Sequence, residues 1–299
     1  MNLFKFHKKN INLNDFIFPL WAFDNGKIKT NCFVDRPIYD YQKKQKINYL
    51  SDDPSTYYLN NYGFRSDDFT NKHNGKHILF AGCSNTFGVG MPQDYLWSKL
   101  VYEKIKEKEL LSGFYNIAIP AGSYFEIISN IFKYCKIFGN PDCIFINFPN
   151  IGRDIIYLHD DAEHLRDNEE QHNKTNYLAA ILSHNIYLML EQYCNSNNIK
   201  LISFSWTQFL VNQYTLIKNK NIVDLYRNKS DEKLYKHFKT FYKIDEKNFF
   251  NDIFKCIDEN KNLDCLIDAY DKRDDQDPHF GYAFHYAWFK FAYSLYMIK

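Results

Sequence analysis

The sequence predicts an α/β fold, built on a mainly parallel central sheet with helices on both faces. From residue 77 onward, short apolar runs alternate with longer segments of helical periodicity, the pattern of repeated strand–helix–strand units. The apolar runs are bounded by Gly, Pro, Asn or polar turns, as buried parallel strands tend to be. The 299 residues are 45% hydrophobic, enough for one large core or for a core with a smaller appended region.

The individual elements follow from these patterns in chain order. Residues 1–71 are aromatic and interrupted by prolines, which predicts an irregular or partly β extension ahead of a domain over 72–299. Short apolar runs predict strands at 77–81, 115–119, 143–148 and 200–206. Helical spacing predicts helices at about 97–111, 124–138 and 176–194, and from about 282 onward. The polar, lysine-rich residues 207–255 predict a helical insertion, either solvated surface helices or a cap over a cleft.

Composition and charge narrow the classes of function. The 37 lysines and arginines nearly cancel the 36 aspartates and glutamates, so the net charge of +1 does not favour a nucleic-acid or anionic-membrane partner. The seven cysteines are scattered without a C-x-x-C pair, which argues against a disulfide framework and a zinc site. The sequence shows neither a signal-peptide core nor an apolar run of membrane-spanning length. We therefore expect a cytoplasmic protein that uses no metal or other cofactor.

The most informative segment lies at the end of the first predicted strand. There the apolar run Ile78–Ala81 leads into Gly82–Gly88, which reads Gly-Cys-Ser-Asn-Thr-Phe-Gly. Ser84, between a buried strand and a helix, is a candidate nucleophile, because small neighbours allow a sharp turn that exposes the hydroxyl and frees nearby N–H groups. An ordinary glycine-bounded loop is the alternative. Strand alternation places the side chain of the adjacent Cys83 in the core.

The other predicted strand ends supply the remaining groups that acyl transfer requires. Loops after parallel strands meet at one edge of the sheet, so these residues are expected to converge. Ala121 and Gly122 follow the second strand and offer backbone N–H groups to a developing oxyanion, and Asn150 follows the third and offers its carboxamide. His279 stands just ahead of the last predicted helix and is the candidate general base.

With these segments in order, the chain resembles the SGNH (GDSL-type) hydrolases, in particular members whose first block reads Gly-Cys-Ser-x-Thr-x-Gly. The resemblance covers four separated blocks and implies a three-layer α/β/α, flavodoxin-like domain. It implies Ser84 as the nucleophile and as one oxyanion donor through its N–H. Ala121, or Gly122 after a shift of one residue, matches the family's second donor, and the asparagine of the third block falls on Asn150.

The fourth block departs from the family's pattern. In the family an aspartate stands three residues before the catalytic histidine, whereas that position relative to His279 is Gln276. The neighbouring Asp277, or alternatively Asp275, is then expected to orient the histidine and to stabilise its imidazolium. A second alignment pairs Asp274 with Asp277, places aspartate where the histidine belongs and implies a weak enzyme or none.

The resemblance implies a serine esterase that hydrolyses an acyl ester through an acyl-enzyme. An O-acetylated carbohydrate is the preferred substrate class, and no cofactor is implied. Two alternatives stay open: a non-catalytic module that binds a glycan or a partner protein, and an acyltransferase that passes the acyl group to a sugar hydroxyl. Residues 159–164 contain two histidines but lack the H-E-x-x-H register, so we expect a solvated surface there. His285 is expected to be a satisfied core histidine.

Overall fold

The computed structural model describes residues 16–18, 23–24, 27–28, 32–34, 56–149, 183, 185–205, 246–260, 263, 269 and 279–298. Its main sheet has four strands in the order β6-β5-β7-β8. These strands are β5 (Ile78–Gly82), β6 (Tyr115–Asn116), β7 (Cys143–Phe148) and β8 (Lys200–Ser205). All neighbouring pairs run parallel. The predicted α/β fold with a mainly parallel sheet is confirmed.

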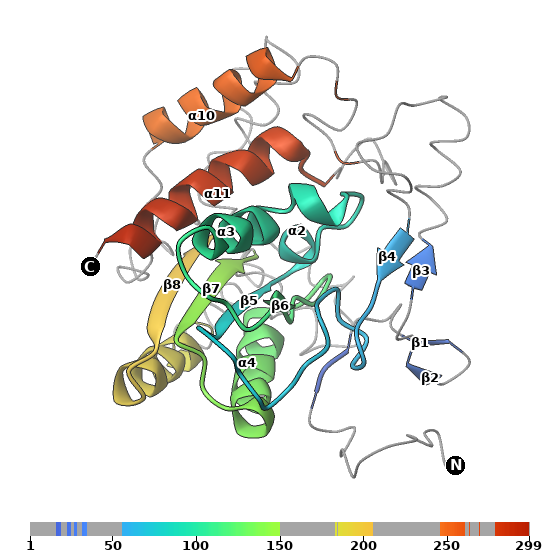
Figure 1. The fold of residues 1–299 in the computed structure, drawn as a ribbon, viewed down its shortest axis with the longest axis vertical. Coiled ribbons are helices and arrows are strands. Elements are labelled where there is room, and N and C mark those ends of the chain that lie inside the picture. Colours follow the sequence, from blue (N-terminus) through green and yellow to red (C-terminus); the bar gives the residue numbers. More distant parts are fainter. Residues whose placement is uncertain are drawn as a thin grey trace, which may run out of the picture.

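Helices cover both faces of this sheet, as Figure 1 shows. On one face lie α3 (Trp97–Lys106) and α11 (Tyr282–Met297), with α10 (Glu246–Glu259) packed on α11. On the other face lie α4 (Tyr124–Phe138) and the helical residues 185–196. The short helix α2 (Ser84–Phe87) and the 3-10 helix η3 (Gln93–Tyr95) connect β5 to α3. The central strands are thereby buried on both sides.

Strand alternation divides the side chains of the sheet between two cores. Ile78 and Phe80 of β5 pack on the α3 and α11 face, whereas Leu79 and Ala81 pack on the α4 face. A run of consecutive apolar residues is therefore needed in this strand, since each face of the sheet has its own covering helices.

The helix predicted at 124–138 has the bounds that the structure shows, whereas the helix predicted at 97–111 ends earlier than expected. Helix α4 has the predicted bounds, because Ser123 and Glu126 form a capping box at its start and Gly139 follows its end. Helix α3 ends at Lys106, five residues before the predicted end. The chain leaves the helix because Lys76 exchanges backbone hydrogen bonds with residues 110 and 112 instead. Residues 206–245, most of the predicted insertion, lie outside the described residues.

Part of the N-terminal region packs into the core on the α4 face. The N-terminal region also contains two antiparallel strand pairs, β1 (Phe23–Asp24) with β2 (Lys27–Ile28), and β3 (Cys32–Val34) with β4 (Thr56–Tyr58). The ring of Phe16 packs among aromatic side chains that include Phe69 and Phe138. The Asn130 carboxamide of α4 accepts from the Ile17 N–H at 2.8 Å and donates to the Ile17 carbonyl at 2.8 Å. These contacts fix residues 16–18 against α4.

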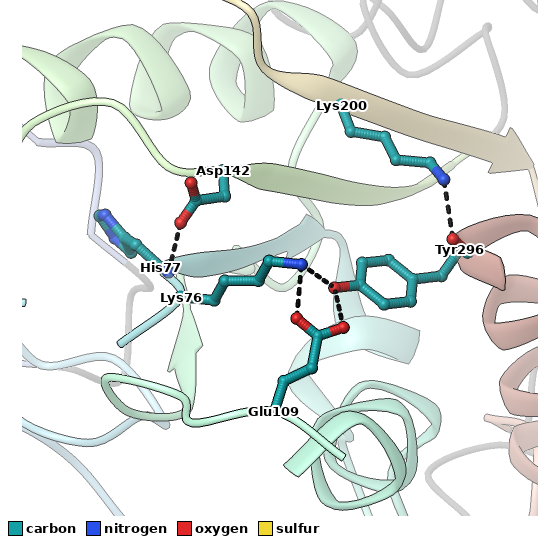
Figure 2. Close-up of polar contacts among 6 residues, drawn as sticks. All are labelled: Lys76, His77, Glu109, Asp142, Lys200 and Tyr296. Atoms are coloured by element: carbon teal, nitrogen blue, oxygen red, sulfur yellow. Dashed lines mark hydrogen bonds and ion pairs between the residues drawn. The ribbon is translucent and has the colours of Figure 1, made fainter. Parts of the chain in front are cut away.

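A polar network fixes the C-terminal end of α11 at the amino edge of the sheet (Figure 2). Lys76 forms an ion pair with Glu109 and donates to the Tyr296 hydroxyl at 3.2 Å, and this hydroxyl donates to Glu109 at 3.0 Å. Lys200, at the start of β8, donates to the carbonyls of Tyr296 and Ile298 at 2.7 and 2.6 Å. A lysine is favourable there because the last carbonyls of a helix have no partner within the helix.

Candidate functional site

Ser84 lies where the chain turns sharply from β5 into α2. We call residues 82–87, which include the end of β5 and the whole of α2, the serine turn. Gly82 has a φ of 154°, and a Cβ there would lie 2.2 Å from Thr86 Oγ1 and 2.7 Å from the Asn147 carbonyl oxygen. The turn therefore requires glycine at this position. Ser84 is the first residue of α2 and is 5% exposed. The sequence-predicted nucleophile thus stands at the carboxyl end of a central parallel strand.

The first two backbone N–H groups of the short helix α2 have no acceptor within the helix. The Thr86 and Phe87 N–H groups both donate to the Cys83 carbonyl, at 3.0 and 2.9 Å. Ser84 and Asn85 occupy the first two helical positions, where a helix offers no carbonyl acceptor of its own. The Ser84 hydroxyl oxygen lies 4.0 Å from Cys83 Sγ, and Cys83 is buried. The beginning of α2 can therefore present N–H donors to a negatively charged oxygen.

Arg65 holds the loop that follows the serine turn. Its Nη1 donates to the carbonyls of Phe87 and Gly88, and its Nη2 donates to the carbonyl of Met91 at 2.7 Å. The guanidinium is 2% exposed and lies 4.7 Å from the ring centroid of Tyr57. Burial lowers the pKa of Arg65 to about 10, so the group stays charged at neutral pH. A buried cation with these carbonyl partners fixes the path of residues 87–91.

The two predicted oxyanion donors after β6 are not equivalent. The Gly122 N–H donates to the Ile119 carbonyl at 2.8 Å and closes a four-residue turn. Within this turn Ala121 has a φ of 60°, the left-handed conformation that normally favours glycine. Strained backbone of this kind recurs at functional sites. Because the Gly122 N–H already has an acceptor, Ala121 is the better candidate for the donor.

His279 is linked through Ala269 to a buried cluster that includes a residue of the serine turn. The Ala269 N–H donates to the His279 carbonyl at 2.9 Å. Ala269 belongs to a buried cluster that also contains Phe87, from the serine turn, and Ala118, from the chain after β6. The backbone of His279 is thus hydrogen-bonded to a residue of the cluster that contains Phe87 and Ala118. The other predicted site residues, Asn150, Asp275 and Asp277, lie outside the described residues.

Asn147 is a candidate site residue that the sequence analysis missed. It lies on β7, directly opposite Gly82 of β5 and Phe204 of β8. The side chain is 0% exposed, and neither its Oδ1 nor its Nδ2 has a hydrogen-bond partner among the described residues. A buried polar group without a partner costs about 1–3 kcal/mol and needs a specific explanation. The signal in the sequence is a single amide within the apolar run Cys143–Phe148.

His285 is a buried histidine of α11 whose ring contacts the start of α3. Its Nδ1 accepts a hydrogen bond from the Trp97 backbone N–H at 3.1 Å, at the first residue of α3. Burial is the main cause that lowers the pKa of His285 to about 3, and the charges of Arg65 and His279 act in the same direction. The imidazole is therefore neutral at physiological pH, and the prediction of a satisfied core histidine is confirmed.

Further findings concern metal ligands, membrane-spanning helices, cysteines and similar proteins. Within the part of the chain that the structure describes, no three His, Cys, Asp or Glu side chains gather as metal ligands, and no helix has the length and apolarity to cross a membrane. The cysteines whose side chains the structure describes are buried free thiols: Cys83, Cys135, Cys143, Cys194 and Cys256. Comparison of the chain with family models, curated proteins and solved structures finds no match. Function must therefore be inferred from the serine turn and its neighbours.

Proposed function

We propose that this protein is a serine esterase of the SGNH type, with Ser84 as the nucleophile and His279 as the general base. One observation carries the proposal: Ser84 begins a helix at a glycine-dependent turn at the carboxyl end of a central parallel strand. This placement supports a nucleophile because it presents the hydroxyl beside backbone N–H groups of the same turn.

The order of the strands supports the same assignment. In the order β6-β5-β7-β8, the first strand of the sheet lies between the second and the third, which is the order of flavodoxin-like domains. Such sheets bind ligands beyond the carboxyl ends of the first and third strands, where the connections diverge. Here these ends lead into Ser84 on one side and into Asn147 and the chain toward Asn150 on the other.

In the proposed reaction, Ser84 Oγ attacks the carbonyl carbon of an ester while His279 accepts its proton. The negative charge that develops on the carbonyl oxygen is stabilised by the N–H groups of Ser84 and Ala121 and by the Asn150 side chain. His279 then donates the proton to the departing alcohol, which leaves an acyl-enzyme. Water, deprotonated by the same histidine, attacks the acyl carbon and releases the carboxylic acid and free Ser84.

The acid that orients His279 is Asp277 or Asp275 in this proposal. The small exposed fraction of Ser84 favours a small acyl group, such as acetyl, over a long acyl chain. An O-acetylated carbohydrate is the substrate class that we propose on this basis. Transfer of the acyl group to a sugar hydroxyl uses the same acyl-enzyme and differs only in the acceptor.

Labelling with a fluorophosphonate, followed by intact mass, tests the proposal. The wild type is expected to gain one phosphonyl group, and Ser84→Ala and His279→Ala to gain none at the same exposure. His73→Ala is the matched control, because His73 is another partly exposed histidine that lies at the opposite edge of the sheet. Folded wild-type protein that is not labelled would contradict the proposal and favour a binding module, for which Gln276 in place of aspartate is the motivating feature. Analysis of the products formed from phenyl acetate in the presence of an added sugar would distinguish acyl transfer from hydrolysis.

A further inference from the structure

We propose that buried water bridges the Thr86 hydroxyl and the Asn147 carboxamide, and that this bridge fixes the serine turn on β7. Thr86 belongs to α2, whose first residue is Ser84, and Asn147 belongs to β7. Both are positioning residues for the nucleophile, a role that rests on the proposed function. Neither side chain contacts the reacting atoms in this proposal, so their effect reaches the reaction only through the place of Ser84.

The two side chains are buried polar groups that lack a protein partner. Thr86 and Asn147 are both 0% exposed, and among the described residues no group hydrogen-bonds Thr86 Oγ1 or either polar atom of the Asn147 carboxamide. Buried groups of this kind are nearly always satisfied in folded proteins, by protein atoms or by ordered water. A hydroxyl and a carboxamide can each donate and accept, so together they suit a water molecule, which needs about two to four polar partners.

The register of the sheet places the Asn147 side chain on the face that Gly82 leaves open. Asn147 lies opposite Gly82 of β5 on one side and Phe204 of β8 on the other. Phe204 packs in the core on the α3 and α11 face, as does Phe145, two residues before Asn147 on β7. Because side chains alternate along a strand and directly opposite residues share a face, Asn147 points to that face too. Gly82 has the same alternation as Phe80, which also packs there.

The Thr86 hydroxyl lies in the space that a side chain at residue 82 would fill. A Cβ at Gly82 would lie 2.2 Å from Thr86 Oγ1, so the hydroxyl stands beside the position directly opposite Asn147. Adjacent strands are about 4.8 Å apart, which sets the scale of the separation between this hydroxyl and the Asn147 side chain. Two groups that share one water are about 5 Å apart, since each hydrogen bond is about 2.8 Å long. The spacing therefore suits a water-mediated contact.

With this bridge, α2 is held through Thr86 from both strands that flank β5. Strands β6 and β7 lie on either side of β5 in the sheet. From β6, the Asn116 carboxamide donates to the Thr86 carbonyl at 3.0 Å. From β7, Asn147 holds the Thr86 hydroxyl through water. The nucleophile, two residues before Thr86, is then fixed relative to both neighbouring strands.

The test compares rates of fluorophosphonate labelling at Ser84 among purified, full-length variants. Thr86→Val keeps the shape of threonine without its hydroxyl, Asn147→Leu keeps the approximate size of asparagine without polar atoms, and a double variant combines the two. We expect each single variant to label at least about ten-fold more slowly than the wild type, because the nucleophile loses its alignment. The double variant should be no slower than the slower single variant, whereas independent effects would multiply to about a hundred-fold. Thr86→Ser keeps the hydroxyl and should recover most of the rate.

Ser203→Ala is the matched control. Ser203 is a buried serine of β8 whose hydroxyl lies 2.8 Å from the Tyr187 hydroxyl, in the core on the α4 face. Its loss should lower the urea midpoint of unfolding and leave the labelling rate unchanged. Labelling as slow as that of Thr86→Val would mean that destabilisation alone accounts for the effect and would overturn the positioning role. A crystal structure of the wild type should show water within hydrogen-bonding distance of Thr86 Oγ1 and of the Asn147 carboxamide, and a dry contact there would overturn the bridge.

The outcomes separate this inference from the proposed function. Slow single variants, a double variant no slower than either, and recovery in Thr86→Ser support the positioning role. A wild-type rate in folded Thr86→Val, or effects that multiply in the double variant, overturns it and leaves the esterase proposal standing. If Asn147→Leu does not fold, Thr86→Val is compared with Thr86→Ser alone, and equal rates overturn the role. If the wild type is not labelled, the proposed function and the positioning role fail together; the urea midpoints of the same variants then test the bridge, and additive shifts overturn it.

Discussion

Mild acid should destabilise this protein, because two of its histidines are buried in the neutral form. His77 and His285 are 3% and 1% exposed, and burial lowers the pKa of each from 6.5 to about 3. The charge of His73 adds to the lowering at His77. In the unfolded chain both imidazoles are in water and have their ordinary pKa near 6.5. The perturbation of interest is therefore a change of pH from 7 to 5.

The sign and the size of the effect follow from the two pKa values. The folded-state pKa lies below the unfolded one, so between about pH 6.5 and pH 3 the unfolded state binds a proton that the folded state excludes. Stability is thus present above this window and is lost as the pH falls through it. Each pH unit below 6.5 costs about 1.4 kcal/mol per histidine, or about 2 kcal/mol for each at pH 5 and about 4 kcal/mol for the pair. Such a loss is large beside a typical net stability of about 5–15 kcal/mol.

Urea unfolding at pH 7, 6 and 5, at constant ionic strength, measures this loss. His77→Gln is the informative variant, because its amide can meet the Tyr134 hydroxyl, which lies 2.7 Å from His77 Nε2, but it does not titrate. Between pH 7 and pH 5 the variant should lose about 2 kcal/mol less than the wild type. Equal losses in the two proteins would refute the reasoning, since they would mean that His77 takes up its proton while folded.

Other substitutions test single features by urea unfolding at pH 7. Gly82→Ala should cost at least about 3 kcal/mol, because the new Cβ would lie 2.2 Å from Thr86 Oγ1; wild-type stability would contradict the tight serine turn. Ala121→Gly should raise stability by about 0.5–1 kcal/mol by relieving a φ of 60°, and a lower stability would argue against that conformation. Tyr296→Phe should cost about 1 kcal/mol through loss of its hydrogen bond to Glu109 (Figure 2), and an unchanged stability would show that this bond contributes nothing in solution.

The sequence predicted those elements of the fold whose signals are local. Helix α4 was predicted with its observed bounds from its helical spacing, and the residues that bound it in the structure, Ser123 and Gly139, are its immediate neighbours in the sequence. The early end of α3 was not predictable in this way, because it depends on pairing of residues 110–112 with Lys76, which is more than thirty positions away in the chain. The same holds for Phe16, whose contribution to the core on the α4 face arises only in the folded chain.

In the candidate site, too, some features could be predicted from the local sequence, whereas others depend on the folded backbone or on residues distant in the chain. The place of Ser84 follows from a buried strand and a glycine next to it, both visible in the sequence. The choice between Ala121 and Gly122 depends on which N–H closes the turn, a property of backbone conformation. The anchoring role of Arg65 was missed because its carbonyl partners lie 22 to 26 residues further along. Side-chain partners distant in sequence leave no periodic pattern.

The hydrogen bonds between Ile17 and Asn130 bear on the order in which the chain folds. They join residues 113 positions apart, so forming them closes a large loop at a cost in chain entropy. Contacts of this range form slowly, and residues 16–18 should dock only after α4 has packed on the sheet. During synthesis from the N-terminus, Phe16 therefore emerges early and finds its aromatic partners late. The growing chain carries apolar surface for much of its synthesis, a condition in which chaperones that shield such surface are most useful.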